Sequence, residues 1–215
     1  MSEKQSGKKL SPDQQAKGMR IAKYIAHAGI CSRRDAEVLV SEGRVKVNGE
    51  VISTPATIIT DHSVKIDDKL INANQEIRLW IVNKPVAVIT SNKDDKNRKT
   101  IFELLPIRMP RTVSVGRLDY NTEGLLLLTT NGDFARHLEL PQNKFIRRYR
   151  ARVYGRVDMV RLNKLVGGIR IDGVKYGSIK VTLDSQKDSN SWLTIVIEEG
   201  KNREIRKVME YFGLQ

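Results

Sequence analysis

An aspartate lies in the stretch of the sequence that is richest in candidate chemistry, residues 116–132, which read Gly-Arg-Leu-Asp-Tyr-Asn-Thr-Glu-Gly-Leu-Leu-Leu-Leu-Thr-Thr-Asn-Gly. A strand is expected to reach Val115 and an apolar strand to leave through Leu128, so Asp119 lies on the loop between two strands. The four consecutive leucines predict that the second strand is buried on both faces. Asp119 can cap its turn through an Asx interaction, or it can be a reactive carboxylate that a rigid scaffold positions. The residue alone leaves both interpretations open.

A second group of candidates lies on an expected strand over residues 145–154, where arginines alternate with smaller side chains. Side chains of a strand alternate between its two faces. One face would carry Tyr149, Ala151 and Val153, and the other would carry Arg148, Arg150 and Arg152. Guanidinium groups pair with phosphate through parallel hydrogen bonds, so the arginines are candidate phosphate contacts, the other interpretation being a solvated run of charge. At this position alone Tyr149 is most simply a core residue.

The first part of the chain predicts a tail and a small helical module. Residues 1–18 are polar and lack periodicity, which predicts a disordered tail. Ser32 is the expected N-cap of a second helix, with Asp35 completing a capping box, and Asn48-Gly49 is a strong hairpin signal. The expected elements are a helix that ends at Gly29, a helix that ends at Gly43, and strands at residues 44–47, 51–52 and 63–66.

The remaining chain predicts an α+β domain with a mixed or antiparallel sheet over residues 78–215, after a linker at 73–77. Strands are expected at residues 78–83, 86–90, 112–115, 125–130, 145–154, 174–183 and 192–198. Helices are expected at residues 100–105, 133–138, 159–166 and 202–212.

The module over residues 19–72 resembles the alpha-L type RNA-binding domain, which a small-subunit ribosomal protein also contains. The resemblance rests on Ile30-Cys31-Ser32-Arg33-Arg34-Asp35-Ala36 and on Gly43-Arg44-Val45-Lys46-Val47-Asn48-Gly49. In that family the second helix and the adjoining strand face RNA, which implies RNA contacts at Arg33, Arg34, Arg44 and Lys46. The alternative is that these are solvated surface charges, but the acidic residues between Glu50 and Glu76 are expected mainly outside this face.

The run over residues 116–132 resembles the signature of pseudouridine synthases of the small- and large-subunit ribosomal RNA type. Three further motifs keep the order of that family: Asn83-Lys84-Pro85, Arg148-Tyr149, and Gly200-Lys-Asn-Arg-Glu-Ile-Arg-Lys-Val-Met. Together these resemblances span about residues 19–215, and the module order is most similar to that of the large-subunit enzymes. They imply an isomerase that converts a specific uridine of ribosomal RNA, most simply of the large subunit, into pseudouridine.

The resemblance also implies roles for individual residues. Asp119 would be the catalytic residue, acting as nucleophile or as base, and Tyr149 would stack on a uracil that is extruded from its helix. Arg206 would be the cation beside Asp119, since a positive charge within about 4–6 Å favours an ionised carboxylate; a phosphate contact is its alternative, with Arg203 as the rival cation. Arg117 would fill the space left by the flipped base, or form a surface ion pair.

Two features depart from the family pattern. Ala87 occupies a position where the first motif usually has glycine, which puts a close backbone approach there in question. The chain also stops at Leu214-Gln215, directly after the last expected helix, whereas relatives continue. We therefore expect a truncated chain with reduced stability or activity.

Composition narrows the class of protein further. Residues 78–215 carry 26 Lys and Arg against 15 Asp and Glu, whereas residues 19–77 carry eight of each, so the positive charge favours polyanion binding by the larger domain. A single cysteine and the absence of a secretory signal or a long apolar run predict a cytoplasmic protein without membrane contact. The three histidines do not cluster, so no metal site is expected, and the absence of a glycine-rich phosphate loop argues against nucleotide binding. The isomerisation that the resemblance implies adds no group, so no cofactor is expected. Nothing in the sequence suggests more than a monomer.

The principal alternative is a non-catalytic ribosome-assembly factor that holds ribosomal RNA with the same basic surfaces. A pure binder has no need for a carboxylate such as Asp119 in a basic groove, which favours the enzyme. A nuclease would require clustered carboxylates or a histidine pair, and the sequence shows neither.

Overall fold

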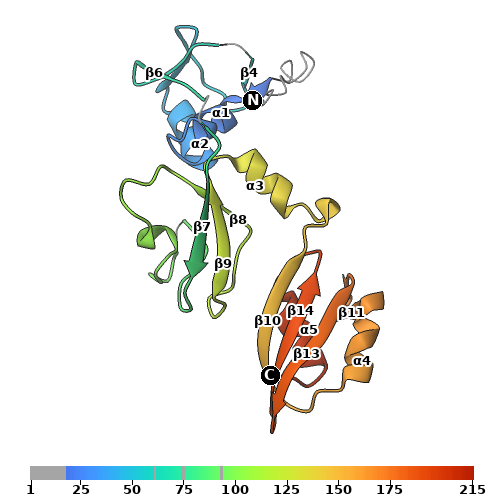
Figure 1. The fold of residues 1–215 in the computed structure, drawn as a ribbon. Coiled ribbons are helices and arrows are strands. Elements are labelled where there is room, and N and C mark those ends of the chain that lie inside the picture. The colour runs from blue at the N-terminus through green and yellow to red at the C-terminus, as the bar shows by residue number, and fades with distance from the viewer. Residues whose placement is uncertain (1–17, 61, 74–75, 93) are drawn as a thin grey trace, which may run out of the picture. The chain divides into compact units, whose positions relative to one another are not determined.

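The computed structural model describes residues 18–60, 62–73, 76–92 and 94–215 (Figure 1). The predicted disordered tail lies outside the described residues except for Gly18, as do two residues of the predicted linker, Asn74 and Gln75. The chain divides into two compact units. One comprises residues 1–81, 104–113 and 128–132, and the other comprises residues 82–103, 114–127 and 133–215. The limits 19–72 and 78–215 remain predictions.

The N-terminal module forms by the local rules that its sequence predicts. The Ser32 hydroxyl accepts a hydrogen bond from the Asp35 amide at 3.1 Å, and the Asp35 carboxylate accepts one from the Ser32 amide at 3.4 Å, which confirms the capping box. Asn48 and Gly49 adopt φ angles of 53° and 93°, which turn the chain between two strands. The elements are β1 (Met19–Arg20), α1 (Ile21–His27), α2 (Arg33–Ser41), β2 (Val45–Val47), β3 (Glu50–Val51), β4 (Ile58–Ile59), β5 (Val64–Ile66) and β6 (Lys69–Ile71).

The core of this module lies between the two helices and an antiparallel sheet of order β3-β2-β5-β6. Ile25 of α1, Val40 of α2 and Val45 of β2 are fully buried in it. The expected elements did not include the strand pair β1-β4 or the edge strand β6 of the four-stranded sheet.

The rest of the chain combines helices with antiparallel sheets, which confirms the α+β class. Its elements are β7 (Leu79–Lys84), the 3₁₀ turn η2 (Phe102–Leu104), β8 (Val113–Val115), β9 (Gly124–Thr129), α3 (Gly132–Glu139), the 3₁₀ turn η3 (Pro141–Asn143), β10 (Arg147–Tyr154), α4 (Met159–Asn163), the 3₁₀ turn η4 (Lys164–Gly167), β11 (Ile169–Ile171), β12 (Val174–Tyr176), β13 (Ile179–Lys187), β14 (Asn190–Ile197) and α5 (Glu204–Tyr211).

Three expected elements differ from the structure. Residues 86–90 form no strand because Ala87 adopts a φ of 60° and its amide bonds to the Tyr120 carbonyl instead of a strand partner. The expected helix at 100–105 is the short turn η2. The expected strand at 174–183 is divided into β12 and β13 at Gly177, whose amide donates to the carboxylate of Glu199 at 2.6 Å.

Strand β9 is central in a sheet of order β7-β9-β8, but the prediction that both of its faces are buried is wrong. Leu126 and Leu128 are buried, whereas Leu125 is 65% exposed. Leu127, on the same face as Leu125, is half-buried, so the two faces of the strand are covered to different extents at its leucines.

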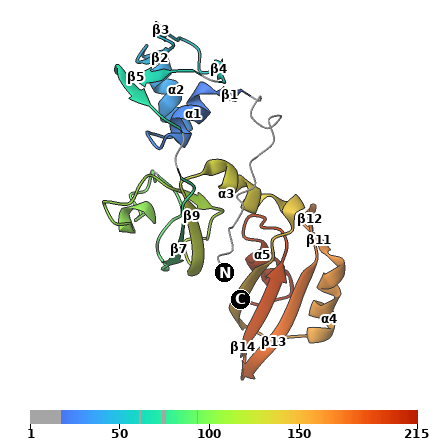
Figure 2. The same cartoon turned by 45° about the horizontal axis from the view of Figure 1, so that its top comes forward.

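The sheet β10-β14-β13 is antiparallel and carries the core of the C-terminal part. Leu162 of α4 and Val208 of α5 pack against Leu193 and Ile195 of β14, so both helices cover one face of this sheet. Figure 2 shows α4 and α5 beside the three strands. The opposite face carries the side chains of alternate residues, and those on β10 are exposed.

Candidate active site

The loop that carries Asp119 connects β8 to β9 and is held by a neighbouring segment of the chain. The Thr90 hydroxyl donates to the Leu118 carbonyl at 3.1 Å and accepts from the Leu118 amide at 3.3 Å. The Ala87 amide donates to the Tyr120 carbonyl at 2.9 Å. The residues on either side of Asp119 are therefore fixed by backbone and hydroxyl contacts that do not use its carboxylate.

Lys84 anchors the far end of the same loop. Its side chain is fully buried at the end of β7, and its ammonium donates to the carbonyls of Thr122 at 2.7 Å and Pro85 at 2.9 Å. Burial lowers the pKa of Lys84, and the negative charge of Asp119 acts in the opposite direction. A buried ammonium that satisfies two carbonyls is a structural anchor that also places positive charge near Asp119.

Arg206 of α5 is the cation that meets Asp119. Its Nε lies 3.5 Å from the Asp119 Oδ2, and the two side chains are 40% and 34% exposed. The same guanidinium donates to the Asn121 carbonyl at 3.2 Å and to the Thr122 hydroxyl at 3.3 Å. Arg203, the rival in the sequence, is instead the exposed N-cap residue of α5, with a φ of 52°. The ion pair is looser than a bidentate pair, so it orients the carboxylate and leaves it partly open to solvent.

Tyr149 lies on the face of β10 that turns toward the helices, as the alternation predicted. Its ring packs against the hydrophobic core of the sheet and is half-buried. Burial raises the pKa of the Tyr149 phenol, which Arg147 opposes and the carboxylates of Glu204 and Asp119 reinforce. The structure thus brings Tyr149 into electrostatic range of Asp119 and keeps its hydroxyl neutral.

The arginines of β10 do not all serve one purpose. Arg147 binds backbone carbonyls: its guanidinium donates to Leu138 and Glu139 of α3, to Phe145 and to Glu198, at 3.0 to 3.3 Å. It therefore joins the end of α3 to the end of β14, and its role is structural. The other three lie exposed on the opposite face of the strand: Arg148, Arg150 and Arg152.

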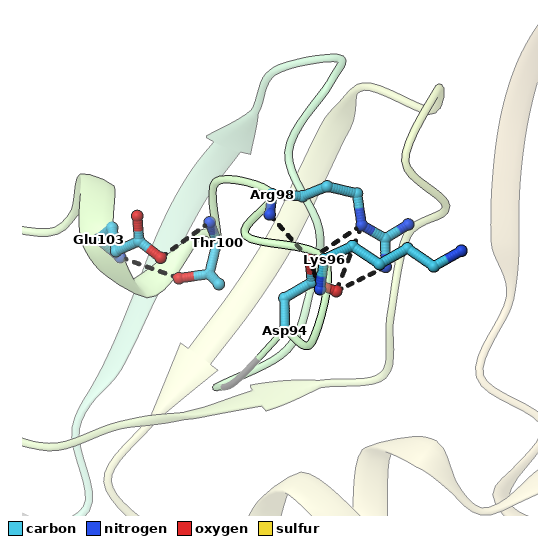
Figure 3. Close-up of polar contacts among 5 residues, drawn as sticks. All are labelled: Asp94, Lys96, Arg98, Thr100 and Glu103. Atoms are coloured by element: carbon cyan, nitrogen blue, oxygen red, sulfur yellow. Dashed lines mark hydrogen bonds and ion pairs between the residues drawn. The ribbon is translucent and has the colours of Figure 1, made fainter.

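A polar loop precedes the catalytic loop in the chain and is internally braced (Figure 3). The Asp94 carboxylate accepts from the Arg98 guanidinium at 2.6 Å and from the backbone amides of Lys96 and Arg98. These hydrogen bonds hold the pKa of Asp94 well below its usual range. The Arg98 guanidinium lies 5.9 Å from the centre of the Tyr120 ring, which follows Asp119 directly. The braced loop thus places the Arg98 guanidinium next to the candidate catalytic loop.

The four basic residues predicted to contact RNA in the N-terminal module differ in their surroundings. Arg33 and Arg34 are exposed in the first turn of α2. Arg44 pairs with Asp67 at 2.6 Å, and Lys46 pairs with Asp68 at 2.7 Å. The expectation that acidic residues lie outside this face is therefore wrong for these two aspartates. RNA would have to compete with them, and the four contacts remain predictions.

Several residues that build the site were not singled out from the sequence. Thr90, Thr122 and Glu139 act through long-range hydrogen bonds, and the Glu139 carboxylate accepts its bond from the Gly116 amide at 2.8 Å. No local pattern predicts such contacts, because the partners are separated by more than 20 residues in the chain. Arg117 is exposed on the loop, and the structure assigns it no role.

The comparisons with known proteins identify the family of the chain. Residues 78–211 match the model of the RNA pseudouridylate synthase family, and residues 19–66 match the model of the S4 domain. The chain therefore belongs to the RNA pseudouridylate synthase family and carries an N-terminal S4 domain. Among the residues that the structure describes, no helix has the length and apolar character needed to cross a membrane.

Individual relatives give the family likeness more detail. An uncharacterized RNA pseudouridine synthase of Rickettsia felis is 51% identical over 91% of this chain and 85% of its own. Ribosomal large subunit pseudouridine synthase B of Bacillus subtilis is 37% identical over 90% and 80%, and that of Pseudomonas aeruginosa is 38% identical over 92% of this chain and 53% of its own. These names confirm the expected likeness to the large-subunit enzymes. A crystal structure of a pseudouridylate synthase has the same fold, with a TM-score of 0.61 at 23% identity over 92% of this chain and 84% of that one.

Proposed function

We propose that this pseudouridine synthase isomerises a uridine of large-subunit ribosomal RNA in the cytoplasm as a monomer, with Asp119 as its catalytic residue. The reaction breaks the bond between the ribose and N1 of uracil, turns the base and rejoins it through C5, so that a proton leaves C5 and N1 gains one. A single carboxylate can act as nucleophile or base at the sugar, and both routes require it in its ionised form.

The observation that carries this proposal is the contact between Asp119 and Arg206 inside a doubly anchored loop. The guanidinium places a positive charge 3.5 Å from the Asp119 carboxylate oxygen, and its hydrogen bonds to Asn121 and Thr122 fix its own position. Part of the Asp119 side chain stays open to solvent and hence to a ribose. Fixed geometry of this kind is what lets one group act at a defined atom.

Tyr149 supports a base-flipping reaction. Its half-buried ring is fixed by the core of the β10 sheet and lies within electrostatic range of Asp119. A neutral, fixed aromatic ring can stack on an extruded uracil. Arg117 would then occupy the space that the base leaves. Arg203 and the exposed arginines of β10 would contact phosphates.

The substrate class rests on the relatives. The enzymes of Bacillus subtilis and Pseudomonas aeruginosa are named for the large ribosomal subunit, and the S4 domain supplies a second RNA-binding module in the same chain. We infer that both modules bind the same ribosomal RNA.

The test uses ribosomal RNA from a strain that lacks this enzyme. The wild-type protein and Asp119→Asn are incubated with the RNA, and pseudouridine is mapped by carbodiimide-blocked primer extension. A stop with the wild type that is absent with the variant supports the proposal and names the uridine. Equal stops with both proteins would remove Asp119 from catalysis. Circular dichroism and RNA affinity of the variant serve as controls, because Asn is nearly isosteric with Asp.

A further inference from the structure

The face of the β10-β14-β13 sheet that turns away from the helices carries a concentration of cations. Strand register places Arg148 beside Val196, Arg150 beside Thr194 and Arg152 beside Trp192. Lys180 of β13 lies beside Val196 on the same face. We name the surface formed by Arg148, Arg150, Arg152, Lys180 and Trp192 the basic face. All five side chains are exposed.

Trp192 is the unusual member of the basic face. It is 38% exposed, in a chain where aromatic residues make up only 6% of the sequence. The Arg150 guanidinium lies 4.7 Å from the centre of its ring and 3.4 Å from the Asp184 carboxylate. Asp184 in turn accepts a hydrogen bond from the Thr194 hydroxyl at 3.0 Å. The tryptophan and its stacked arginine are thus held as an ordered pair of planar groups at the surface.

Cationic and planar side chains bind different parts of RNA, the phosphates and the faces of the bases respectively. Guanidinium groups at successive outward positions of a strand follow one another at steps of about 6.7 Å, so an extended backbone of phosphates can follow them. Phosphate binding alone gives no use for an exposed tryptophan. Aromatic rings and guanidinium planes stack on bases, and bases offer their faces only where they are unpaired. The combination therefore favours a single strand over a duplex.

We propose that the basic face binds a single-stranded segment of the substrate RNA, with bases stacked on the pair formed by Trp192 and Arg150. Arg148, Arg152 and Lys180 contact the phosphates of that segment. The inference rests on the proposed function for the identity of the RNA. Tyr149 lies on the other face of β10, so the bound segment is separate from the flipped uridine. The basic face would therefore be a second binding site for the same RNA.

The first experiment uses the fluorescence of Trp192 itself. Trp80→Phe leaves Trp192 as the remaining tryptophan of the sequence. This protein is titrated with a 12-nucleotide RNA of alternating adenosine and cytidine, and with the same strand annealed to its complement. We expect quenching by the single strand and several-fold weaker quenching by the duplex. Absence of quenching, or equal quenching by both, would overturn the proposal.

Binding of a labelled copy of the same RNA separates stacking from folding defects. Trp192→Ala is expected to weaken binding at least about fivefold, the lower end of the loss for one stacked base, and Trp192→Phe should lose less. Arg152→Ala is compared with Arg170→Ala, which removes one exposed positive charge from β11, outside the basic face. Only Arg152→Ala should reduce the salt dependence of the quenching. Equal effects of both arginine variants would contradict the proposed surface.

The result with the single strand is independent of catalysis because that strand contains no uridine. Asp119→Asn in the Trp80→Phe protein should show unchanged quenching. If the wild type forms pseudouridine and the Trp80→Phe protein shows no quenching, the basic face is excluded as an RNA site and the proposed function stands. If quenching persists but no pseudouridine forms on ribosomal RNA, the proposed function fails and the RNA-binding surface stands.

Discussion

The ammonium of Lys84 lies 2.7 Å from the carbonyl oxygen of Thr122, so a buried cation at the end of β7 fixes the loop that carries Asp119. The two residues are 38 positions apart in the chain. The contact makes the position of the candidate catalytic carboxylate depend on a side chain that does not touch it.

Replacing Lys84 by Met is therefore expected to reduce both stability and turnover. The substitution removes the donor of two partly buried hydrogen bonds. A hydrogen bond that involves a charged group contributes about 1.5–3 kcal/mol to stability. We expect kcat to fall while KM changes little, because the loop loses its alignment and the RNA-binding surfaces stay intact. Single-turnover kinetics and thermal unfolding measure the two effects, with Lys175→Met on exposed β12 as control. Unchanged kcat in a folded Lys84→Met protein would show that the anchor is dispensable.

Arg206→Gln is expected to lower kcat at least about tenfold. The variant removes the ion pair with Asp119 and the charged hydrogen bonds to Asn121 and Thr122 that hold the cation in place. A hydrogen bond that involves a charged group is worth about 1.5–3 kcal/mol, and 1.4 kcal/mol corresponds to a factor of about ten. Arg203→Gln removes the same charge from a neighbouring position and should lower RNA affinity while kcat at saturating RNA is retained. Rates under single-turnover conditions distinguish the two. Equal losses of kcat in both variants would argue that the two arginines act only on phosphate.

Ala87→Gly is expected to stabilise the protein. Ala87 holds a φ of 60°, a left-handed conformation that costs a residue with a Cβ about 1–2 kcal/mol. Glycine removes that strain but gains about 0.4–1 kcal/mol of chain entropy when unfolded, so the net gain lies between about 0 and 1.6 kcal/mol. Urea unfolding measures it, with Ala135→Gly in α3 as a control that should destabilise. Loss of stability in Ala87→Gly would show that the conformation is not strained.

The free energy of unfolding is expected to depend on pH through the carboxyl group of Glu204. Burial raises the pKa of this carboxyl above its ordinary value of 4.5, aided by the nearby charge of Glu199. The folded protein thus holds a proton that the unfolded chain releases near pH 4.5, so stability falls as the pH rises above 4.5 toward the folded pKa. Glu204→Gln should flatten this slope and become increasingly more stable than the wild type toward neutral pH. Urea unfolding at several pH values measures it, with Glu210→Gln on the exposed side of α5 as control. A parallel slope in wild type and Glu204→Gln would assign the pH dependence to other groups.

Arg147 should behave as a structural residue. Its guanidinium donates to four backbone carbonyls, so Arg147→Ala is expected to lower the free energy of unfolding by about 2–4 kcal/mol. Arg152 lies on the exposed, opposite face of the same strand. Arg152→Ala should therefore change the free energy of unfolding by less than about 0.5 kcal/mol. Thermal unfolding compares the two variants. Similar stability of both would mean that the carbonyls find other donors.

Local rules account for most of what could be predicted from the sequence. The capping box at Ser32, the turn at Asn48-Gly49 and the alternation on either side of Tyr149 depend on neighbours a few residues away. The contact of Arg206 with Asp119 was expected only through the resemblance of its motif to the family. Without that resemblance, 86 intervening residues would have hidden it.

Contacts set by tertiary structure could not be predicted. In the sequence Arg147 cannot be told apart from the arginines that follow it. Its structural role depends on the carbonyls that accept its hydrogen bonds, and these come from other parts of the chain. The residues at 86–90 have strand-forming composition, yet Ala87 and Thr90 make their hydrogen bonds with the loop at 118–120. Asp67 and Asp68, between β5 and β6, reach Arg44 and Lys46 because β5 pairs with β2, which the sequence pattern alone does not show.

The two neutral oxygens that hold Arg206, from Asn121 and Thr122, have a consequence for the timing of the reaction. A free guanidinium would have to give up rotational freedom and shed its hydration when the substrate arrives. Here that ordering is completed while the chain folds, so little reorganisation remains for the moment when charge shifts at the ribose. The enzyme meets its RNA with the electrostatic environment of the carboxylate already assembled.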